Sequence, residues 1–286
     1  MTMIKPASSL ATLGLALILV WIADPLAADS RPPAAPASAV LTYADLADLA
    51  DSAPLVIRAQ PRKIVQVEPE RARGLRPGWG RFYVEAKTEG VIAGTVPLGE
   101  ALRYLVDLPL DPKGKPPAFK KKSVVLFARA VPGRPGELQL VRPDAQLLWD
   151  AQLDTRLRAV LKELYAPGAP HKVTGVREAI HVGGDLAGEG ETQLFLATAN
   201  GEPAAVTVNR TPGRPPRWSV SFSEVVAGDA AVPGRDTLGW YRLACFLPAQ
   251  LPKAANISNA AADREAAARD YRFVIEQLGP CPRSRQ

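Results

Sequence analysis

The stretch Ser123-Val124-Val125-Leu126-Phe127-Ala128-Arg129-Ala130-Val131 decides the fold of the first half of the chain. Its continuous apolar run, Val124 to Ala128, is rich in β-branched and aromatic residues and predicts a short strand buried on both faces. The turn-forming residues Pro132-Gly133-Arg134-Pro135-Gly136 follow it. Glu137 to Val141 then alternates polar and apolar residues, so we expect it to pair back on the first strand.

Three more strands are expected upstream, over residues 54–67, 81–86 and 101–106. Pro61 lies inside the first of them and predicts an edge or a bulge there, because proline has no N–H group to donate. A short amphipathic helix, Tyr43 to Ala50, precedes these strands. Five strands joined by Gly/Pro-bearing turns predict a small, closed or nearly closed, five-stranded OB-like β-barrel domain over residues 43–149.

The period of the apolar residues changes at Asp150, and residues 150–165 predict an amphipathic helix. Four strands of an antiparallel meander are then expected, over residues 172–182, 192–199, 204–209 and 218–223. Asn200-Gly201 between the second and third is a strong hairpin signal. Two covering helices follow, one capped by Asp236 and one over residues 260–278. The predicted fold class is therefore α+β, with the barrel followed by a helix-covered antiparallel sheet in a second domain, residues 150–286.

The first thirty residues resemble an export signal. Lys5 precedes an apolar run from Leu10 to Ala23, and small residues follow up to Ala28. We expect a signal peptide over residues 1–28 and a Pro/Ala-rich linker over residues 29–42, with cleavage after Ala39 as an alternative to cleavage after Ala28. An uncleaved anchor is the other alternative, although the run is shorter than the roughly 20 residues of a spanning helix. The expected location is periplasmic or secreted, with no transmembrane anchor after cleavage.

Export sets the interpretation of the two cysteines. An oxidising compartment predicts a disulfide between Cys245 and Cys281. The two histidines, His171 and His181, are isolated in sequence and predict no metal site. No nucleophile elbow, zinc-protease, phosphate-loop or dinucleotide motif occurs, so no catalytic residue and no cofactor are expected.

Positive charge is concentrated in the first half of the chain. Residues 40–149 contain 17 Lys/Arg and 12 Asp/Glu, a net charge of +5, whereas residues 150–286 contain 16 and 15, a net charge of +1. Much of the excess lies in one lysine segment, residues 113–122. Its members are Lys113, Lys115, Lys120, Lys121 and Lys122. Such a segment is either a solvated connection or a surface for an anionic partner. Export disfavours nucleic acid, and Phe119 alone is too little for base stacking.

Three stretches of the first half resemble the OB-type module of the netrin and tissue-inhibitor family: Ala53 to Ala59, Phe82 to Ala86 leading to Ile92-Ala93-Gly94, and Val124 to Arg129. That module carries cysteines, one of them at the mature N-terminus, and this stretch has none, so the resemblance does not imply protease inhibition. The whole chain is similar to uncharacterised exported proteins of alphaproteobacteria, which implies a periplasmic location.

These observations predict a non-enzymatic binding or envelope-accessory protein. The expected partner is an envelope protein or an anionic envelope polymer or lipid. One alternative is a hydrolase acting on an envelope polymer, which needs clustered acids, with Asp185, Glu189, Glu191 and Glu224 as candidates. The other alternative is a structural subunit of an envelope complex.

Overall fold

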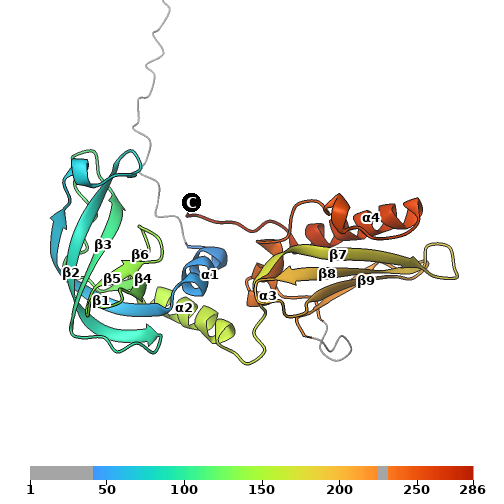
Figure 1. Cartoon of the computed structure of the whole chain (residues 1–286), viewed down its shortest axis with the longest axis horizontal. Helices are drawn as coiled ribbons and strands as arrows, with labels where there is room; N and C mark the ends of the chain where they lie inside the picture. The colour runs from blue at the N-terminus through green and yellow to red at the C-terminus, as the bar shows by residue number, and fades with distance from the viewer. Residues whose placement is uncertain (1–40, 224–230, 286) are drawn as a thin grey trace, which may run out of the picture. The chain divides into compact units, whose positions relative to one another are not determined.

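The computed structural model of the chain describes residues 41–223 and 231–285. The predicted signal peptide, most of the linker and Glu224 lie outside these ranges. The described residues form a mixed α+β structure with two antiparallel sheets and four α-helices (Figure 1).

The first sheet contains six strands in the order β3-β2-β1-β4-β5, with β6 also paired to β4. Their bounds are β1 Leu55–Gln66, β2 Trp79–Ala93, β3 Ala101–Pro109, β4 Val124–Ala130, β5 Leu138–Leu140 and β6 Gln146–Leu148. The sequence pattern predicted five of these strands. It missed β6 because three residues are too few to show an alternation.

Strand β4 lies in the interior of this sheet, as its apolar run predicts. It pairs with β1 on one side and with β5 and β6 on the other. Every residue from Val124 to Ala128 is buried. Burial on both faces is therefore confirmed for the stretch that decides the fold.

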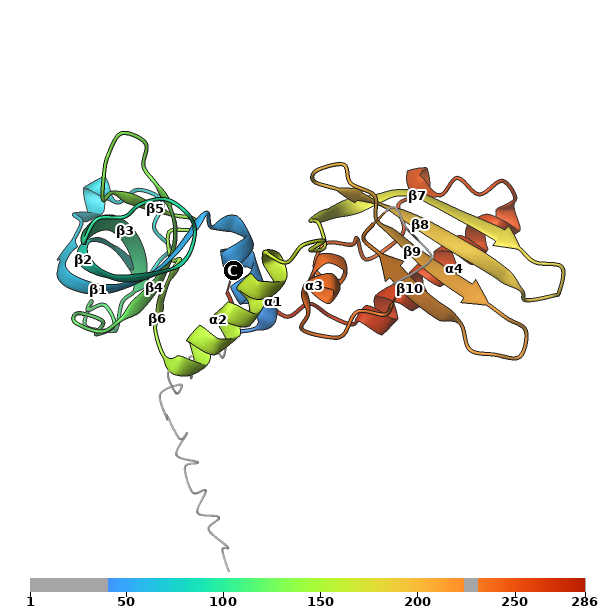
Figure 2. The same cartoon turned by 90° about the horizontal axis from the view of Figure 1, so that it is seen from below.

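The first sheet curls, as Figure 2 shows, but its strand pairing does not close it into a barrel. Its end strands, β3 and β5, are linked by an isolated parallel bridge between Arg103 and Glu137. Arg103 N donates to Gly136 O at 2.8 Å. Since β5 has only three residues, it offers too few backbone groups to pair along the nine-residue β3. The strand pairing therefore does not confirm the predicted five-stranded barrel.

Pro61 lies where β1 changes partners. Residues Val56 to Ala59 pair with both β2 and β4, and beyond them β1 pairs with β2 alone. A register shift occurs between Pro61 and Lys63. The predicted edge or bulge at this proline is confirmed.

Two helices flank the first sheet. Helix α1, Tyr43–Ser52, begins at a capping box in which Thr42 and Asp45 satisfy each other's backbone N–H groups. Helix α2, Ala151–Leu164, is capped by Asp150, whose carboxylate accepts from Leu153 N at 2.7 Å. The two helices pack against each other.

The second sheet is the predicted meander, in the order β10-β9-β8-β7. Its strands are β7 Val173–Gly183, β8 Gly190–Thr198, β9 Ala205–Arg210 and β10 Arg217–Ser221. Helix α4, Ala261–Leu278, lies along one face, packed on β7 and β8 (Figure 1). This confirms a helix-covered antiparallel sheet.

Helix α3, Leu238–Ala244, differs from prediction in two respects. Its N-cap is Thr237 rather than Asp236, because Asp236 has φ 58° and a cap residue needs extended backbone. The helix also packs against α4, α1 and α2, so it connects to the first half of the chain as well as to the second.

Candidate functional site

The lysine segment connects β3 to β4. Its five lysines, Lys113, Lys115, Lys120, Lys121 and Lys122, are all exposed. None of their ammonium groups forms an ion pair with a residue in the described part of the chain. Their charge therefore faces solvent uncompensated.

The backbone of this segment is nevertheless held in place. Asp111 accepts from the N–H groups of Lys113 and Lys115 at 2.9 and 2.8 Å. Phe119 is buried in the core at 2% exposure. Beyond it, Lys121 N donates to Pro61 O at 2.9 Å, and Gln60 Nε2 donates to Lys121 O at 3.2 Å. The lysines are thus displayed from a fixed backbone with free side chains.

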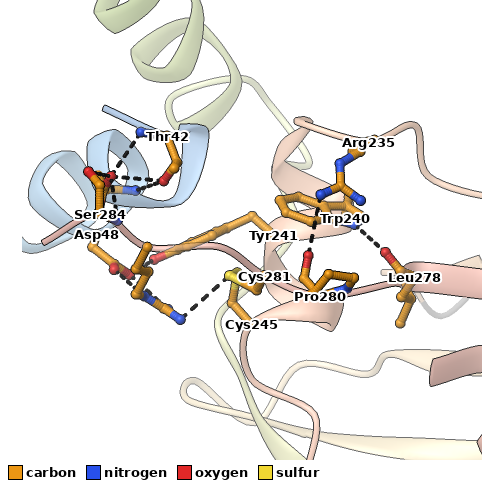
Figure 3. Close-up of a disulfide and its surroundings, with 12 residues drawn as sticks. Thr42, Asp48, Arg235, Trp240, Tyr241, Cys245, Leu278, Pro280, Cys281 and Ser284 are labelled. Carbon is orange, nitrogen blue, oxygen red and sulfur yellow. Dashed lines mark hydrogen bonds and ion pairs between the residues drawn. A yellow bond between two sulfur atoms is a disulfide. The ribbon is translucent and has the colours of Figure 1, made fainter. Parts of the chain in front are cut away.

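The predicted disulfide between Cys245 and Cys281 is present (Figure 3). It joins the end of α3 to the segment beyond α4, 36 residues later in the chain. Trp240 donates from Nε1 to Leu278 O at 2.8 Å close by. This bridge fixes the start of a C-terminal segment, residues 281–285.

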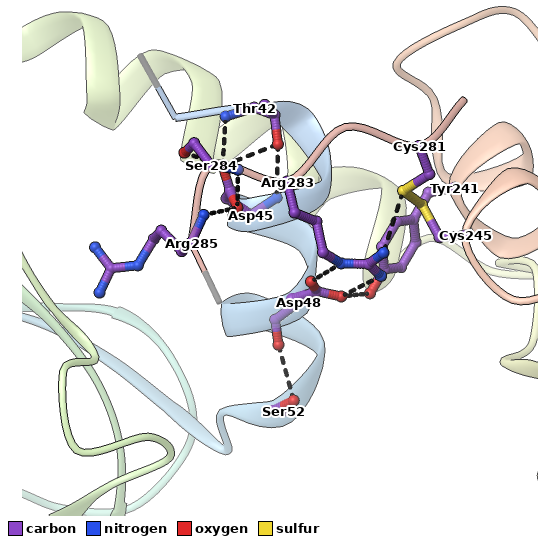
Figure 4. A network of polar contacts seen from close by, with 10 residues as sticks. All are labelled: Thr42, Asp45, Asp48, Ser52, Tyr241, Cys245, Cys281, Arg283, Ser284 and Arg285. Carbon is purple, nitrogen blue, oxygen red and sulfur yellow. Dashed lines mark hydrogen bonds and ion pairs between the residues drawn. A yellow bond between two sulfur atoms is a disulfide. The ribbon is translucent and has the colours of Figure 1, made fainter. Parts of the chain in front are cut away.

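The C-terminal segment lies along α1, as Figure 4 shows. Arg283 pairs with Asp48 at 2.6 Å, and Asp48 also accepts from Tyr241 Oη at 2.6 Å. Ser284 donates to the Asp45 carboxylate from its N–H group at 3.1 Å and from its hydroxyl at 2.6 Å. Burial of Asp45 raises its pKa, but hydrogen bonds from Ser284 and Thr42 together outweigh burial and hold the pKa below the usual 3.8.

The last residue of that segment, Arg285, reaches a group of arginines that the sequence analysis did not single out. Arg76, Arg142 and Arg285 all contact the Asp144 carboxylate, at 3.2, 3.6 and 3.2 Å. Trp79 lies beside them, with the Arg76 guanidinium 3.8 Å from its ring centroid. We call these five residues the arginine notch. A signal for it was the density of arginine around the start of β2, where Arg71, Arg73, Arg76 and Arg81 fall within eleven residues.

Two cavities, of about 240 and 260 Å³, open onto the notch. Both are lined by Arg76, Trp79 and Asp144, together with Asp107. Arg142 lines the first and Arg285 the second. The notch is therefore an arginine-rich depression rather than a flat surface.

The two histidines occupy different surroundings. His171 is half-buried and lines a cavity of about 830 Å³, together with Lys172 and Arg242. The Arg242 guanidinium there is already engaged by Asp51, at 2.7 and 2.8 Å. Among the residues that line this cavity, no nucleophile is hydrogen-bonded to a base.

His181 belongs to a buried polar cluster beneath α4. Its Nδ1 lies 2.8 Å from Thr192 Oγ1, and Thr192 donates to Asp270. Arg210 Nε pairs with the other Asp270 oxygen at 2.5 Å. Ser258 Oγ accepts from His181 N at 3.0 Å. Thr192 and Asp270 are fully buried, so this cluster fastens α4 to the sheet.

Three of the four candidate acids for a hydrolase, Asp185, Glu189 and Glu191, lie within the described residues. Asp185 and Glu189 are exposed in the β7–β8 loop, and Glu189 accepts from Leu186 N at 3.2 Å. Glu191 lies on β8 and accepts from Gln193 at 2.7 Å. Among the described residues, no group of three or more His, Cys, Asp or Glu side chains is arranged to hold a metal ion.

Three large aromatic residues of the second half, Trp218, Trp240 and Tyr241, belong to the core. Trp240 and Tyr241 are among the largest fully buried side chains, and Trp218 is 8% exposed. Tyr241 and Phe246 meet edge to face, with ring centroids 5.2 Å apart. These rings are packed together rather than lining a ligand groove.

No helix in residues 41–223 and 231–285 is long and apolar enough to cross a membrane. Comparison of the chain with models of known protein families gives no match, and comparison with curated proteins gives none either.

Proposed function

We propose that this protein is an exported, non-enzymatic binding protein that contacts an anionic component of the cell envelope through the lysine segment. The export signal, the periplasmic location and an OB-like character of the first sheet are parts of this proposal. The observation that carries it is the display of five exposed and unpaired lysines from a fixed backbone.

The physical basis is long-range electrostatic attraction combined with a small loss of conformational entropy on binding. Uncompensated like charges raise the local concentration of anionic partners and speed their association. A backbone already fixed by Asp111, Phe119 and Pro61 loses little conformational entropy on binding. The lysine side chains keep their own freedom, which suits a repeating or fluid anionic surface.

The test replaces Lys120, Lys121 and Lys122 by Glu in the full chain. We expect binding to vesicles containing phosphatidylglycerol, or to an anionic polysaccharide, to fall at least tenfold at low salt. Wild-type binding to the same probe is expected to weaken steeply with added salt, because Debye screening shortens the reach of exposed charges.

A matched control is the variant Arg214→Glu/Arg217→Glu/Lys253→Glu. It makes the same change in net charge at exposed residues of the second half that form no ion pair with described residues. We expect the control to retain most of the binding. Equal loss in both variants, or binding that ignores salt and both changes, contradicts the proposal.

A further inference from the structure

The outer face of the first sheet carries a row of apolar side chains. Val65 on β1, Tyr83 on β2 and Leu105 on β3 are paired directly across these neighbouring strands. Residues directly opposite each other in an antiparallel sheet lie on the same face. Phe82 and Val84, the neighbours of Tyr83 along β2, are buried, so the row points away from the core. We call Val65, Tyr83 and Leu105 the apolar row.

The apolar row is open to solvent. Val65 is 45% exposed and Leu105 49% exposed, and Tyr83 between them is half-buried. Figure 2 shows β2 on the side of the first sheet away from α1 and α2. Single exposed apolar side chains are common on protein surfaces, whereas side chains that join across strands form a continuous patch. The row is therefore a candidate interaction surface.

Basic side chains lie beside the apolar row. Tyr83 also lines a cavity of about 610 Å³ on this face. The lining of the cavity includes three basic and two acidic side chains, which are Arg62, Lys87, Arg103, Glu85 and Glu100. All three basic residues are exposed, and none of them forms an ion pair with a described residue.

The acids near the cavity do not balance these cations. Lys63 pairs with Glu85 at 3.3 Å, which neutralises that carboxylate. Glu137, whose backbone lies beside Arg103, pairs with Arg134 at 3.3 Å. Glu100 is then the one unpaired acid in the lining against three unpaired cations, which leaves a net charge of +2.

The lysine segment meets β1 next to this cavity. Lys121 N donates to Pro61 O at 2.9 Å, and Arg62, the following residue of β1, lines the cavity. The positive charge of the segment therefore continues onto the outer face of the sheet. A single surface thus combines exposed lysines, unpaired cations and the apolar row.

We propose that this outer face binds the surface of an anionic lipid bilayer, with the apolar row entering the boundary between headgroups and acyl chains. The inference rests on the proposed function, for which it names the partner. Binding of this kind grows with the apolar area buried and with attraction to anionic lipids, and the face offers both. Long basic side chains keep their charged ends among the headgroups while apolar side chains lie deeper.

The apolar row favours a bilayer over the other anionic partners. A hydrated polysaccharide complements the lysines but offers no acyl region to Val65 and Leu105. A second copy of this chain would bring two faces of the same charge together, which is unfavourable. A bilayer complements both the charge and the apolar row.

The first experiment measures co-sedimentation of the full chain with vesicles of phosphatidylcholine and phosphatidylglycerol at low salt. We expect Val65→Gln/Leu105→Gln to bind about tenfold more weakly than the wild type, because less apolar area enters the interface. The matched control is Leu148→Gln/Val182→Gln, which changes two aliphatic residues of 50% and 61% exposure on β6 and β7. The control is expected to bind within about twofold of the wild type.

A second measurement reports on the apolar row itself. A nitroxide spin label is attached to Leu105→Cys, with the Cys245–Cys281 disulfide intact. Vesicles are expected to increase its collisions with oxygen, which is more soluble in acyl chains than in water, and to decrease its collisions with a water-soluble nickel chelate. The same label on Leu148→Cys should show neither change. Because the readout is local, vesicle binding by residues 1–40, which every form shares, cannot imitate it.

The outcomes separate this inference from the proposed function. Wild-type binding to an anionic polysaccharide but not to the vesicles overturns the bilayer and leaves the lysine segment supported. Vesicle binding that Val65→Gln/Leu105→Gln leaves unchanged, with no change at the label, does the same. Self-association in sedimentation equilibrium that this variant abolishes identifies a second copy as the occupant and also overturns the proposal.

The lysine segment has its own criterion. If Lys120→Glu/Lys121→Glu/Lys122→Glu binds both probes as the wild type does, the proposed function is rejected. The label at position 105 then still decides whether the outer face enters a bilayer. Melting temperatures near that of the wild type are expected for the Gln variants, because the replaced side chains are exposed.

Discussion

The two sheets of this protein are held together in different ways. The first is built round β4, whose residues Val124 to Ala128 are apolar and buried on both faces. The second is covered by α4 on one face, and a polar cluster that includes Arg210, Asp270 and His181 lies under that helix. The first sheet is therefore specified by a continuous apolar run, and the second by a polar contact between distant residues.

That difference affects how each half tolerates change. Apolar packing loses stability in proportion to the contacts removed, whereas a buried charge that loses its partner costs far more than the pair contributed. The most sensitive residue of the second half is accordingly Asp270, which is fully buried and bonded to Thr192 and Arg210.

The largest effect is expected for Asp270→Ala. It leaves Arg210 and Thr192 facing a buried gap, and we expect the free energy of unfolding to fall by about 3–5 kcal/mol. Denaturant unfolding, followed by circular dichroism, measures this. The control is Glu265→Ala, an exposed acid on the same helix, which is expected to change stability by less than about 0.5 kcal/mol.

A combined replacement sharpens the comparison between the sheets. In Thr192→Val/Arg210→Met/Asp270→Leu, Asp270 and the two side chains bonded to it become apolar, so no guanidinium is left without its carboxylate. We expect most of the lost stability to return, because buried ion pairs are often replaceable by apolar residues of similar volume. If the triple variant is as unstable as Asp270→Ala, an apolar contact cannot replace this cluster, and the prediction is contradicted.

Removing the disulfide is expected to have the next largest effect. In the chain-entropy model, the variant Cys245→Ser/Cys281→Ser loses about 3–4 kcal/mol, because the 36-residue loop is no longer closed in the unfolded chain. Thermal unfolding with and without reductant measures the loss. The variant should be insensitive to reductant and the wild type sensitive; equal melting temperatures for both would contradict the prediction.

The smallest effect concerns Asp45, which links α1 to the C-terminal segment. Its pKa is lowered by hydrogen bonds from Ser284 and Thr42 in spite of burial, so the folded state binds this proton more weakly than the unfolded state. Its contribution to stability is therefore complete above about pH 4 and is lost as the pH falls through the lower, folded-state pKa.

Comparison with Asp45→Asn measures that contribution. We expect the wild type to be more stable than the variant by about 1 kcal/mol between pH 5 and 8, and the difference to shrink below about pH 4. Deleting Ser284 and Arg285 should remove most of this pH dependence. A difference that stays constant down to pH 2 would show that Asp45 is not the titrating group.

What the sequence predicts well is local. The run at Val124 to Ala128, the Asn200-Gly201 hairpin and the period of residues 150–165 each lie within one window, and each corresponds to an observed element. The disulfide was predictable because Cys245 and Cys281 are the two cysteines of the chain. Strand β6 and the cap of α3 were not, since both depend on tertiary partners or on a single backbone angle.

The polar sites could not be predicted from the sequence for the same reason. The cluster under α4 takes its members from positions 181, 192, 210, 258 and 270, and the arginine notch takes its arginines from positions 76, 142 and 285. No window of sequence contains either set. The lysine segment was visible because its five lysines fall within one short stretch of sequence, residues 113–122.

The contact between Ser284 and Asp45 has a consequence for the timing of folding. The two residues are 239 positions apart, so α1 leaves the ribosome long before its partner is synthesised. During that interval the capping box with Thr42 gives the Asp45 carboxylate an interim set of donors. Helix α1 is thus capped before Ser284 is synthesised, and its contact with the C-terminal segment can form only afterwards.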